Sequence, residues 1–362
     1  FYYSYLNIWP GFFKTFIKLI ENDDNNKLRK LTIIDYYLRI LLSIHSEIGD
    51  QLYQNDPKTV EVSNNLKDVI RMNDMSSIVM NWKYIIEFIE SSNNTDDETV
   101  VVLKTLFKVI GSWVGWIDIT LIIGDKFFLD NFYKFFEVKM LRDDIIELFM
   151  EIISKKMLLD KKMELLQLFN INQIIATSMS KLQLLKSEDL ENSADDVNFY
   201  EHISKLINTT GIEYLIIIEK SDSSIELKQL AFTKLNEILP FFLEILPNDY
   251  DDISLQIFGF ISNFLTILKK IRRYNNTEIL DISNYNDFLE NLLTKIIIKM
   301  KYDEEDDGLG DDEEDEDVRE FEEMRSKLKV FQEAISNINP DLYLTTVNNI
   351  INETLFKPDM VK

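Results

Sequence analysis

The 362-residue sequence contains no cysteine, only two histidines, nine glycines and six prolines. Without cysteine, a disulfide-stabilised scaffold and a thiolate zinc site are excluded, and two imidazoles are too few for a histidine-rich metal centre. Reducing compartments such as the cytosol and the nucleus are therefore permitted. Scarce glycine and proline leave few tight turns. No run of about 18 uncharged apolar residues occurs, so we expect no membrane insertion.

The chain is rich in acidic residues and in apolar residues. Asp and Glu number 63 against 39 Lys and Arg, which gives a net charge of -24 and a pI near 4.5. Hydrophobic residues make up 46% and aromatic residues 12% of the chain, enough to build a large core despite this charge. The chain begins at Phe1 and lacks the basic start of a signal peptide, so we expect a fragment of a longer protein.

The spacing of apolar residues predicts helices throughout. From about Ser224 to Leu246, apolar residues recur every three or four positions, with Pro240 expected to kink this helix. The same step continues from Ile253 to Ile271, and the connection at Pro247 and Asn248 predicts that the two helices are antiparallel. Equivalent patterns occur near 145–152, 197–206, 289–296 and 321–335.

Polar segments rich in Asn or Asp separate these helical patterns. Their positions group the helices into pairs, with one pair about every 40 to 50 residues. Breaks are expected at 22–26, 56–57, 91–97, 124, 156–160, 185–193, 247–248 and 274–284. This period is typical of HEAT-type arrays, in which each helix pair covers its apolar face with its neighbours. The sequence therefore predicts an all-α HEAT-type helical-repeat solenoid, an α-α superhelix. We expect one continuous array over 1–362, with a flexible acidic insertion at 303–317.

The acidic segment 303–317 holds twelve carboxylates among fifteen residues, half of the net charge of the chain. Mutual repulsion predicts either a solvated insertion or a mobile anionic arm that attracts a basic partner. The segment also approaches the pattern of a calcium-binding EF-hand loop through Asp303, Glu305, Asp307, Gly308, Asp311 and Glu314. Glu305 and Gly310 depart from that pattern, and in so acidic a tract several matches are nearly forced, so we expect no metal.

Two clusters of basic residues are present. The denser one lies at the predicted end of a helix, where the helix dipole favours cations: Lys269, Lys270, Arg272 and Arg273. The second spans a predicted connection between helices: Lys155, Lys156, Lys161 and Lys162. Such residues are either solvated helix ends or contacts to the phosphates of a nucleic acid.

No pattern predicts catalysis, a cofactor or a bound nucleotide. His45 and His202 lie within helical patterns without metal-ligand spacing, and no phosphate-binding P-loop motif occurs. A nucleophile with an adjacent base is also lacking, so we expect no enzyme. Trp113 and Trp116, on either side of Gly115, are interpreted as packing residues between helices.

Several short motifs follow one another in an order that resembles a known family. They are Trp9-Pro10 with Phe12-Phe13, Trp116-Ile117-Asp118-Ile119, Leu141-Arg142, Lys156-Met157, Lys162-Met163 with Leu165-Leu166, Asp196-Val197-Asn198-Phe199 with Lys205-Leu206-Ile207, Asp249 to Ser254 with Gln256-Ile257-Phe258, Lys299 to Tyr302, and Glu320-Phe321 with Met324-Arg325 and Leu328-Lys329. This series resembles the exportin-T family, the tRNA exportins of the importin-β (karyopherin) superfamily. The abundance of Asn, Asp, Ile and Lys suggests an AT-rich fungal genome, and the motifs suggest the middle of the family's longer chain.

The resemblance implies a non-enzymatic nuclear export receptor. Such a receptor binds tRNA together with the GTP form of Ran, meets nuclear pore proteins, and releases its cargo in the cytoplasm after GTP hydrolysis. We expect a monomer that shuttles between nucleus and cytoplasm. The hypothesis assigns phosphate contacts to Lys269, Lys270, Arg272 and Arg273, and assigns the Ran-facing role to Asp311, Asp312, Glu313, Glu314, Asp315, Glu316 and Asp317.

Two alternatives remain open. A different karyopherin with a protein cargo shares the fold and the dependence on Ran. A helical-repeat scaffold without any link to Ran shares only the fold.

Overall fold

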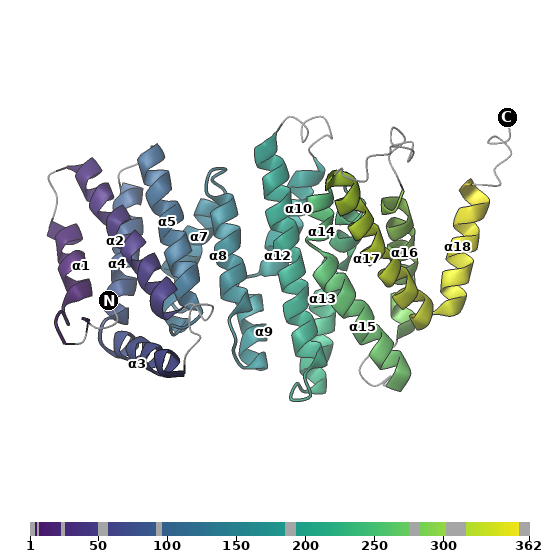
Figure 1. The fold of residues 1–362 in the computed structure, drawn as a ribbon, viewed down its shortest axis with the longest axis horizontal. Helices are drawn as coiled ribbons and strands as arrows, with labels where there is room; N and C mark the ends of the chain where they lie inside the picture. The colour runs from purple at the N-terminus through teal and green to yellow at the C-terminus, as the bar shows by residue number, and fades with distance from the viewer. Residues whose placement is uncertain are drawn as a thin grey trace. The chain divides into compact units, whose positions relative to one another are not determined.

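The computed structural model describes residues 4–5, 7–22, 26–49, 57–91, 96–184, 193–274, 282–301 and 316–354. Every regular element in these ranges is a helix (Figure 1). The predicted all-α helical-repeat fold is therefore confirmed. The chain divides into two compact units, residues 1–156 and 157–362, each of which is described by itself.

Unit 1 contains α1 Phe12–Asn22, α2 Lys27–Ile48, α3 Pro57–Asn73, α4 Met75–Ser91, α5 Asp97–Val114, α6 Thr120–Ile123, α7 Lys126–Phe136 and α8 Arg142–Ser154. Unit 2 contains α9 Leu159–Leu168, α10 Ile171–Gln183, α12 Ala194–Glu219, α13 Ile225–Ile245, α14 Asp251–Leu255, α15 Phe258–Tyr274, the 3-10 helix η2 Ile282–Tyr285, α16 Asn286–Lys299, α17 Glu316–Ile338 and α18 Pro340–Thr354.

In unit 1, α5 packs between α2 and α8, and α2 and α5 lie side by side and run in the same direction (Figure 1). Lys27 at the start of α2 pairs with Asp96 before α5, while Trp113 at the end of α5 donates to the Leu41 carbonyl in α2, 3.2 Å away. Contacts between α4 and α7 join residues 42 and 44 positions apart in the chain. This separation agrees with the repeat that the sequence predicts.

The same arrangement is present in unit 2. Hydrogen bonds from α12 to α15 and to the turn before it join residues 51 to 55 positions apart. Tyr285 in η2 and Asn339 just before α18 bond to residues of earlier helices at separations of 49 and 53. Gly211 of α12 leaves room for the stacked rings of Phe242 from α13 and Phe260 from α15, whose centroids lie 3.9 Å apart. A methyl group at position 211 would stand 2.5 Å from the Phe260 ring. The helices can therefore approach closely only with glycine there.

Both cores are aliphatic and aromatic. Trp82 and Trp113 are fully buried and meet edge to face at 6.0 Å, and Trp113 lies 4.7 Å from Trp116. The interpretation of Trp113 and Trp116 as packing residues is thus confirmed. Burying a large apolar side chain contributes about 1.5–3 kcal/mol. Repeated along each unit, such burial holds the helices together.

One predicted helix is divided. Apolar spacing predicts a single helix from Ile253 to Ile271, but the chain forms α14 and α15 with a turn at Gln256 and Ile257. The reason lies in tertiary contacts, because the first turn of α15 receives a partner from α12: the Phe260 amide donates to Oδ1 of Asn208 at 2.8 Å. The first backbone amides of a helix have no acceptor within the helix, so they need acceptors from elsewhere, such as Asn208.

Candidate nucleic-acid interface

The candidate interface is the end of α15 in unit 2. Buried apolar side chains on one side of this helix, such as Phe264, Leu265 and Leu268, fix its orientation. The four basic residues therefore face solvent; we call them the basic cluster, Lys269, Lys270, Arg272 and Arg273. They occupy the end of the helix, where unpaired carbonyl groups favour positive charge. The structure thus brings together the residues that the sequence singles out.

One member of the basic cluster, Lys270, forms an ion pair at the surface. Nζ of Lys270 pairs with the carboxylate of Glu219, which ends the parallel neighbour α12. Both side chains are about half exposed, so this ion pair is weak. Lys269, Arg272 and Arg273 form no ion pair within the part of the chain that the structure describes. Their charges remain available to an anionic partner.

The second basic group, Lys155, Lys156, Lys161 and Lys162, lies in a different environment. Nζ of Lys155 donates to the carbonyls of Val114, Gly115 and Ile117 at 2.7, 3.1 and 3.0 Å. These carbonyls lie at the end of α5 and just after it, so Lys155 caps a helix within unit 1. The ammonium group is used internally and does not point to a nucleic-acid site.

In unit 2, Lys162 is buried between α9 and α12. Its Nζ lies 2.9 Å from the Glu213 carboxylate, and the two side chains are 5% and 10% exposed. Burial lowers the pKa of Lys162, because the charged form loses water, and the carboxylate of Glu213 opposes this shift. Lys161 is exposed and pairs with Glu164 at 2.8 Å, a hydrogen bond that raises its pKa. Only Lys156 is exposed without an ion pair among the described residues of this group.

The predicted Ran-facing segment lies largely beyond the described residues. Asp311, Asp312, Glu313, Glu314 and Asp315 fall outside them, as does the EF-hand-like run from Asp303 to Glu314. Glu316 and Asp317 begin α17, but the described side chains of this helix start later. The acidic segment and its role stay predictions.

The two histidines lie on helices, as predicted. Nε1 of Trp116 donates to Nδ1 of His45 at 3.3 Å, and Nδ1 of His202 lies 2.8 Å from the Asn198 carbonyl in its own helix. Within the described ranges, no three His, Cys, Asp or Glu side chains are grouped so that they could hold a metal ion. No helix in those ranges is long and apolar enough to cross a bilayer.

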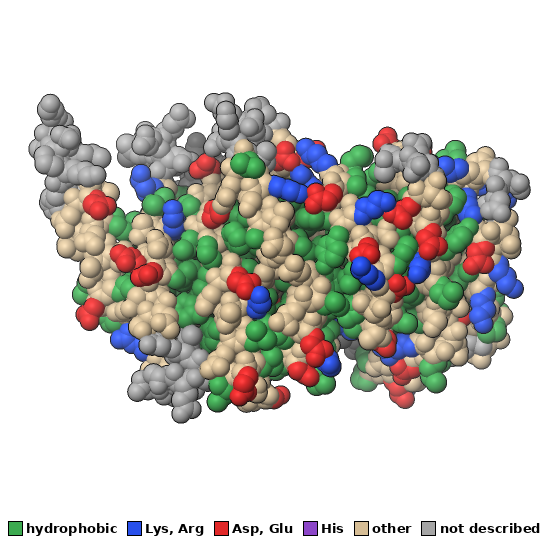
Figure 2. Space-filling model, turned by 180° about the vertical axis from the view of Figure 1, so that it is seen from behind, with side chains coloured by type: hydrophobic (Ala, Val, Ile, Leu, Met, Phe, Trp, Pro, Cys, Tyr) green, Lys and Arg blue, Asp and Glu red, His purple; other side chains and the backbone are tan. Residues whose placement is uncertain are grey.

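Charges of both signs alternate over the face in Figure 2, and neither gathers into a broad patch there. The basic cluster on α15 is therefore a local concentration of positive charge on a chain whose net charge is -24. Such a balance limits indiscriminate attraction of nucleic acid.

Comparison with known proteins gives two family matches. Residues 225–361 match the family model Exportin-T, and residues 1–149 match the model for Exportin 1-like protein. Neither match covers half of the chain, but the two lie in separate parts of it.

Individual relatives match over nearly the whole chain. Exportin-T of Candida albicans is 34% identical over 361 residues, covering 98% of this chain and 33% of the relative. Exportin-T of Scheffersomyces stipitis is 35% identical over 330 residues, covering 91% and 30%, and that of Aspergillus clavatus is 30% identical over 366 residues, covering 97% and 34%. The chain thus spans about a third of the length of the curated relatives it matches.

Proposed function

Because this chain is related in sequence to the fungal Exportin-T proteins over nearly its whole length, we propose that it is part of a nuclear export receptor for tRNA. In this proposal the complete receptor binds tRNA together with the GTP form of Ran and releases both in the cytoplasm. It acts as a transport receptor rather than as an enzyme, and GTP hydrolysis by Ran supplies the energy. It shuttles through the nuclear pore as a monomer and contacts pore proteins.

The observation that carries the proposal is the extent of the relationship. The similarity runs through both units, with 34% identity over 98% of the chain to the relative from Candida albicans. The helical-repeat fold supports it, because stacked helix pairs expose long surfaces on which large partners bind. In contrast, a scaffold unrelated to transport predicts no such similarity to exportins.

Within this receptor, we assign contacts to tRNA phosphates to the basic cluster on α15. Three of its four cations are exposed without an ion pair among the described residues, and Arg and Lys are the usual partners of phosphate oxygens. The segment Asp311 to Asp317 is proposed to face a basic patch on Ran. Binding of the two partners to one repeat array then couples them by about 1 to 3 kcal/mol, a typical allosteric coupling.

The proposal is tested by capture of tRNA on the immobilised full-length protein, with and without Ran locked in its GTP form. We expect tRNA to be retained strongly only when GTP-locked Ran is present. Retention of a protein cargo instead of tRNA, again with Ran, would establish the alternative of another karyopherin. Absence of Ran binding by the intact protein would leave only a helical-repeat scaffold.

A further inference from the structure

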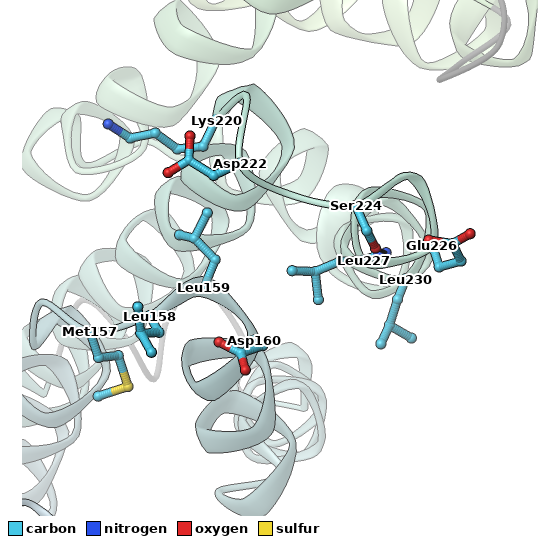
Figure 3. A pocket seen from close by; sticks show the side chains of 10 residues that line it. All are labelled: Met157, Leu158, Leu159, Asp160, Lys220, Asp222, Ser224, Glu226, Leu227 and Leu230. Atoms are coloured by element: carbon cyan, nitrogen blue, oxygen red, sulfur yellow. Dashed lines mark hydrogen bonds between the residues drawn. The ribbon is translucent and has the colours of Figure 1, made fainter.

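Unit 2 contains a hollow of about 750 Å³ that neither the sequence patterns nor the proposed function account for (Figure 3). One wall is formed by the chain that leads into α9, and the other by the connection between α12 and α13 with the first turns of α13. The residues that line it are Met157, Leu158, Leu159, Asp160, Lys220, Asp222, Ser224, Glu226, Leu227 and Leu230. Its volume lies within the range of about 300–1,000 Å³ typical of ligand sites.

Half of these lining side chains are large and apolar. Leu227 extends from α13 toward the side on which Leu159 lies, and Leu230 points downward from α13 in this view (Figure 3). Leu158 is 74% exposed and Leu230 37% exposed, so the hollow presents aliphatic surface to water. Filling it with apolar side chains of a partner would remove that surface from water, which is favourable.

Both walls are held in place before any partner arrives. Ser223 donates its Oγ hydrogen to the Ile217 carbonyl at 2.6 Å, and Oγ of Ser224 accepts from the Leu227 amide at 3.2 Å. On the opposite wall, the buried ion pair of Lys162 with Glu213 ties α9 to α12. A preformed hollow costs little ordering on binding, which favours affinity.

The charged groups around the hollow are mainly acidic. Asp160, Asp222 and Glu226 line it against a single cation, Lys220. The pKa of Glu226 is lowered by its own backbone amide and by the Ser224 hydroxyl at the start of α13, so its carboxylate is ionised at neutral pH. This arrangement attracts cations and repels phosphate groups.

We propose that the hollow is a docking site for a basic amphipathic peptide segment of a protein partner. Leucine-sized side chains enter between Leu159 and the α13 leucines, and flanking Lys or Arg residues of the partner face Asp160 and Asp222. Glu226, whose carboxylate lies on the side of α13 away from Leu159 (Figure 3), adds to the negative charge at the rim. This is the helix-in-groove mode of recognition, with charge complementarity at the rim. The hollow shares no lining residue with the basic cluster, so the interaction is independent of the proposed tRNA contacts.

The probe is a short, fluorescently labelled helical peptide with Leu on one face and Lys on the other, titrated with the 362-residue chain while anisotropy is recorded. Two matched peptides carry Glu in place of Lys, or Ala in place of Leu. We expect binding of the Leu/Lys peptide only. The double variant Leu158→Ser with Leu230→Ser should weaken it by about tenfold or more, since each leucine contributes apolar area.

A triple variant tests the charge separately: Asp160→Asn, Asp222→Asn and Glu226→Gln. It should weaken binding of the Leu/Lys peptide and reduce the dependence of its affinity on salt. Matched controls at exposed positions elsewhere in unit 2 should leave binding unchanged, namely Ile298→Ser with Leu344→Ser for the leucines, and Glu320→Gln with Glu323→Gln and Asp341→Asn for the three carboxylates. Far-ultraviolet circular dichroism establishes that each variant is folded.

Equal binding of the Glu peptide or the Ala peptide would overturn the proposal, as would unchanged affinity in both the leucine and the carboxylate variants. A third contrary result concerns RNA. If tRNA displaces the peptide and the leucine variant loses affinity for tRNA, the hollow belongs to a nucleic-acid site instead.

Discussion

Two basic segments of this chain, residues 155–162 and 269–273, each carry four cations but use them differently. In the first, Lys155 caps the end of α5 and Lys162 is buried against Glu213. In the second, all four basic side chains are exposed, and only Lys270 forms an ion pair among the described residues. A cluster of Lys and Arg in a sequence therefore does not show which of these residues stabilise the fold and which are available to a partner.

The largest effect is expected from the buried ion pair. Lys162→Met leaves the carboxylate of Glu213 buried without its partner, so the free energy of unfolding should fall by about 3–5 kcal/mol. Urea denaturation of the 362-residue chain measures this loss. The double variant Lys162→Met with Glu213→Leu should recover most of it, because two apolar side chains replace the pair. A single variant as stable as the parent chain would show that Lys162 is not a structural cation.

The helix cap gives an intermediate effect. Lys155→Met removes a charged donor from three carbonyl groups near the end of α5, which should lower the free energy of unfolding by about 1–3 kcal/mol. The adjacent Lys156→Met is the control, because Lys156 is exposed and should change stability by less than about 0.5 kcal/mol. Equal effects at the two positions would contradict the distinction drawn between them.

The basic cluster should have little effect on stability and a clear effect on tRNA. Replacing its four members by Gln in the full-length protein should change the free energy of unfolding by less than about 0.5 kcal/mol. The slope of the logarithm of tRNA affinity against the logarithm of salt concentration should flatten by about 3 to 4, since each phosphate contact contributes roughly 0.9.

The control for this experiment replaces four exposed lysines of unit 1 by Gln: Lys14, Lys18, Lys58 and Lys108. This variant removes the same four positive charges, and it should leave most of the dependence of tRNA affinity on salt concentration unchanged. If both quadruple variants flatten the slope equally, general charge and not the end of α15 governs the attraction of tRNA.

The smallest effect is a dependence of stability on pH that arises at Lys162 in the first segment. Burial lowers the pKa of Lys162 below its ordinary value of 10.5. Between the folded and unfolded pKa values, the unfolded chain binds more protons, so the free energy of unfolding rises with pH there. As the pH approaches 10.5 from below, stability should therefore rise relative to the variant that lacks both Lys162 and Glu213. A difference that falls with pH would contradict the assigned burial.

Helices were the most predictable feature. The expected helix from Ser224 to Leu246 is α13, Ile225–Ile245, and Ser224 caps it by accepting from the Leu227 amide. Breaks expected at 91–97 and 156–160 separate α4 from α5 and α8 from α9. The apolar period and the capping residues are local properties, so a single sequence carries them. The resemblance to exportin-T, read from the order of short motifs, is likewise confirmed.

Other breaks were not predicted. Between α3 and α4 the chain turns at Asp74, which is buried and accepts a hydrogen bond from the Tyr5 hydroxyl, 69 positions earlier. Between α9 and α10, Asn170 adopts a left-handed conformation with φ of 44°, one that asparagine tolerates better than most residues. Neither turn contains Gly or Pro, the residues that usually mark a break.

The sequence by itself determined the fold class, the approximate repeat length, the family to which the chain is related, and the exposed cluster at the end of α15. Tertiary structure alone decided that Asn208 caps α15, that Lys162 meets Glu213, and that an apolar hollow forms between α9 and α13. The physical reason is distance along the chain. Helical periodicity acts over three or four residues, whereas these contacts join residues about 50 positions apart that meet only when successive repeats stack.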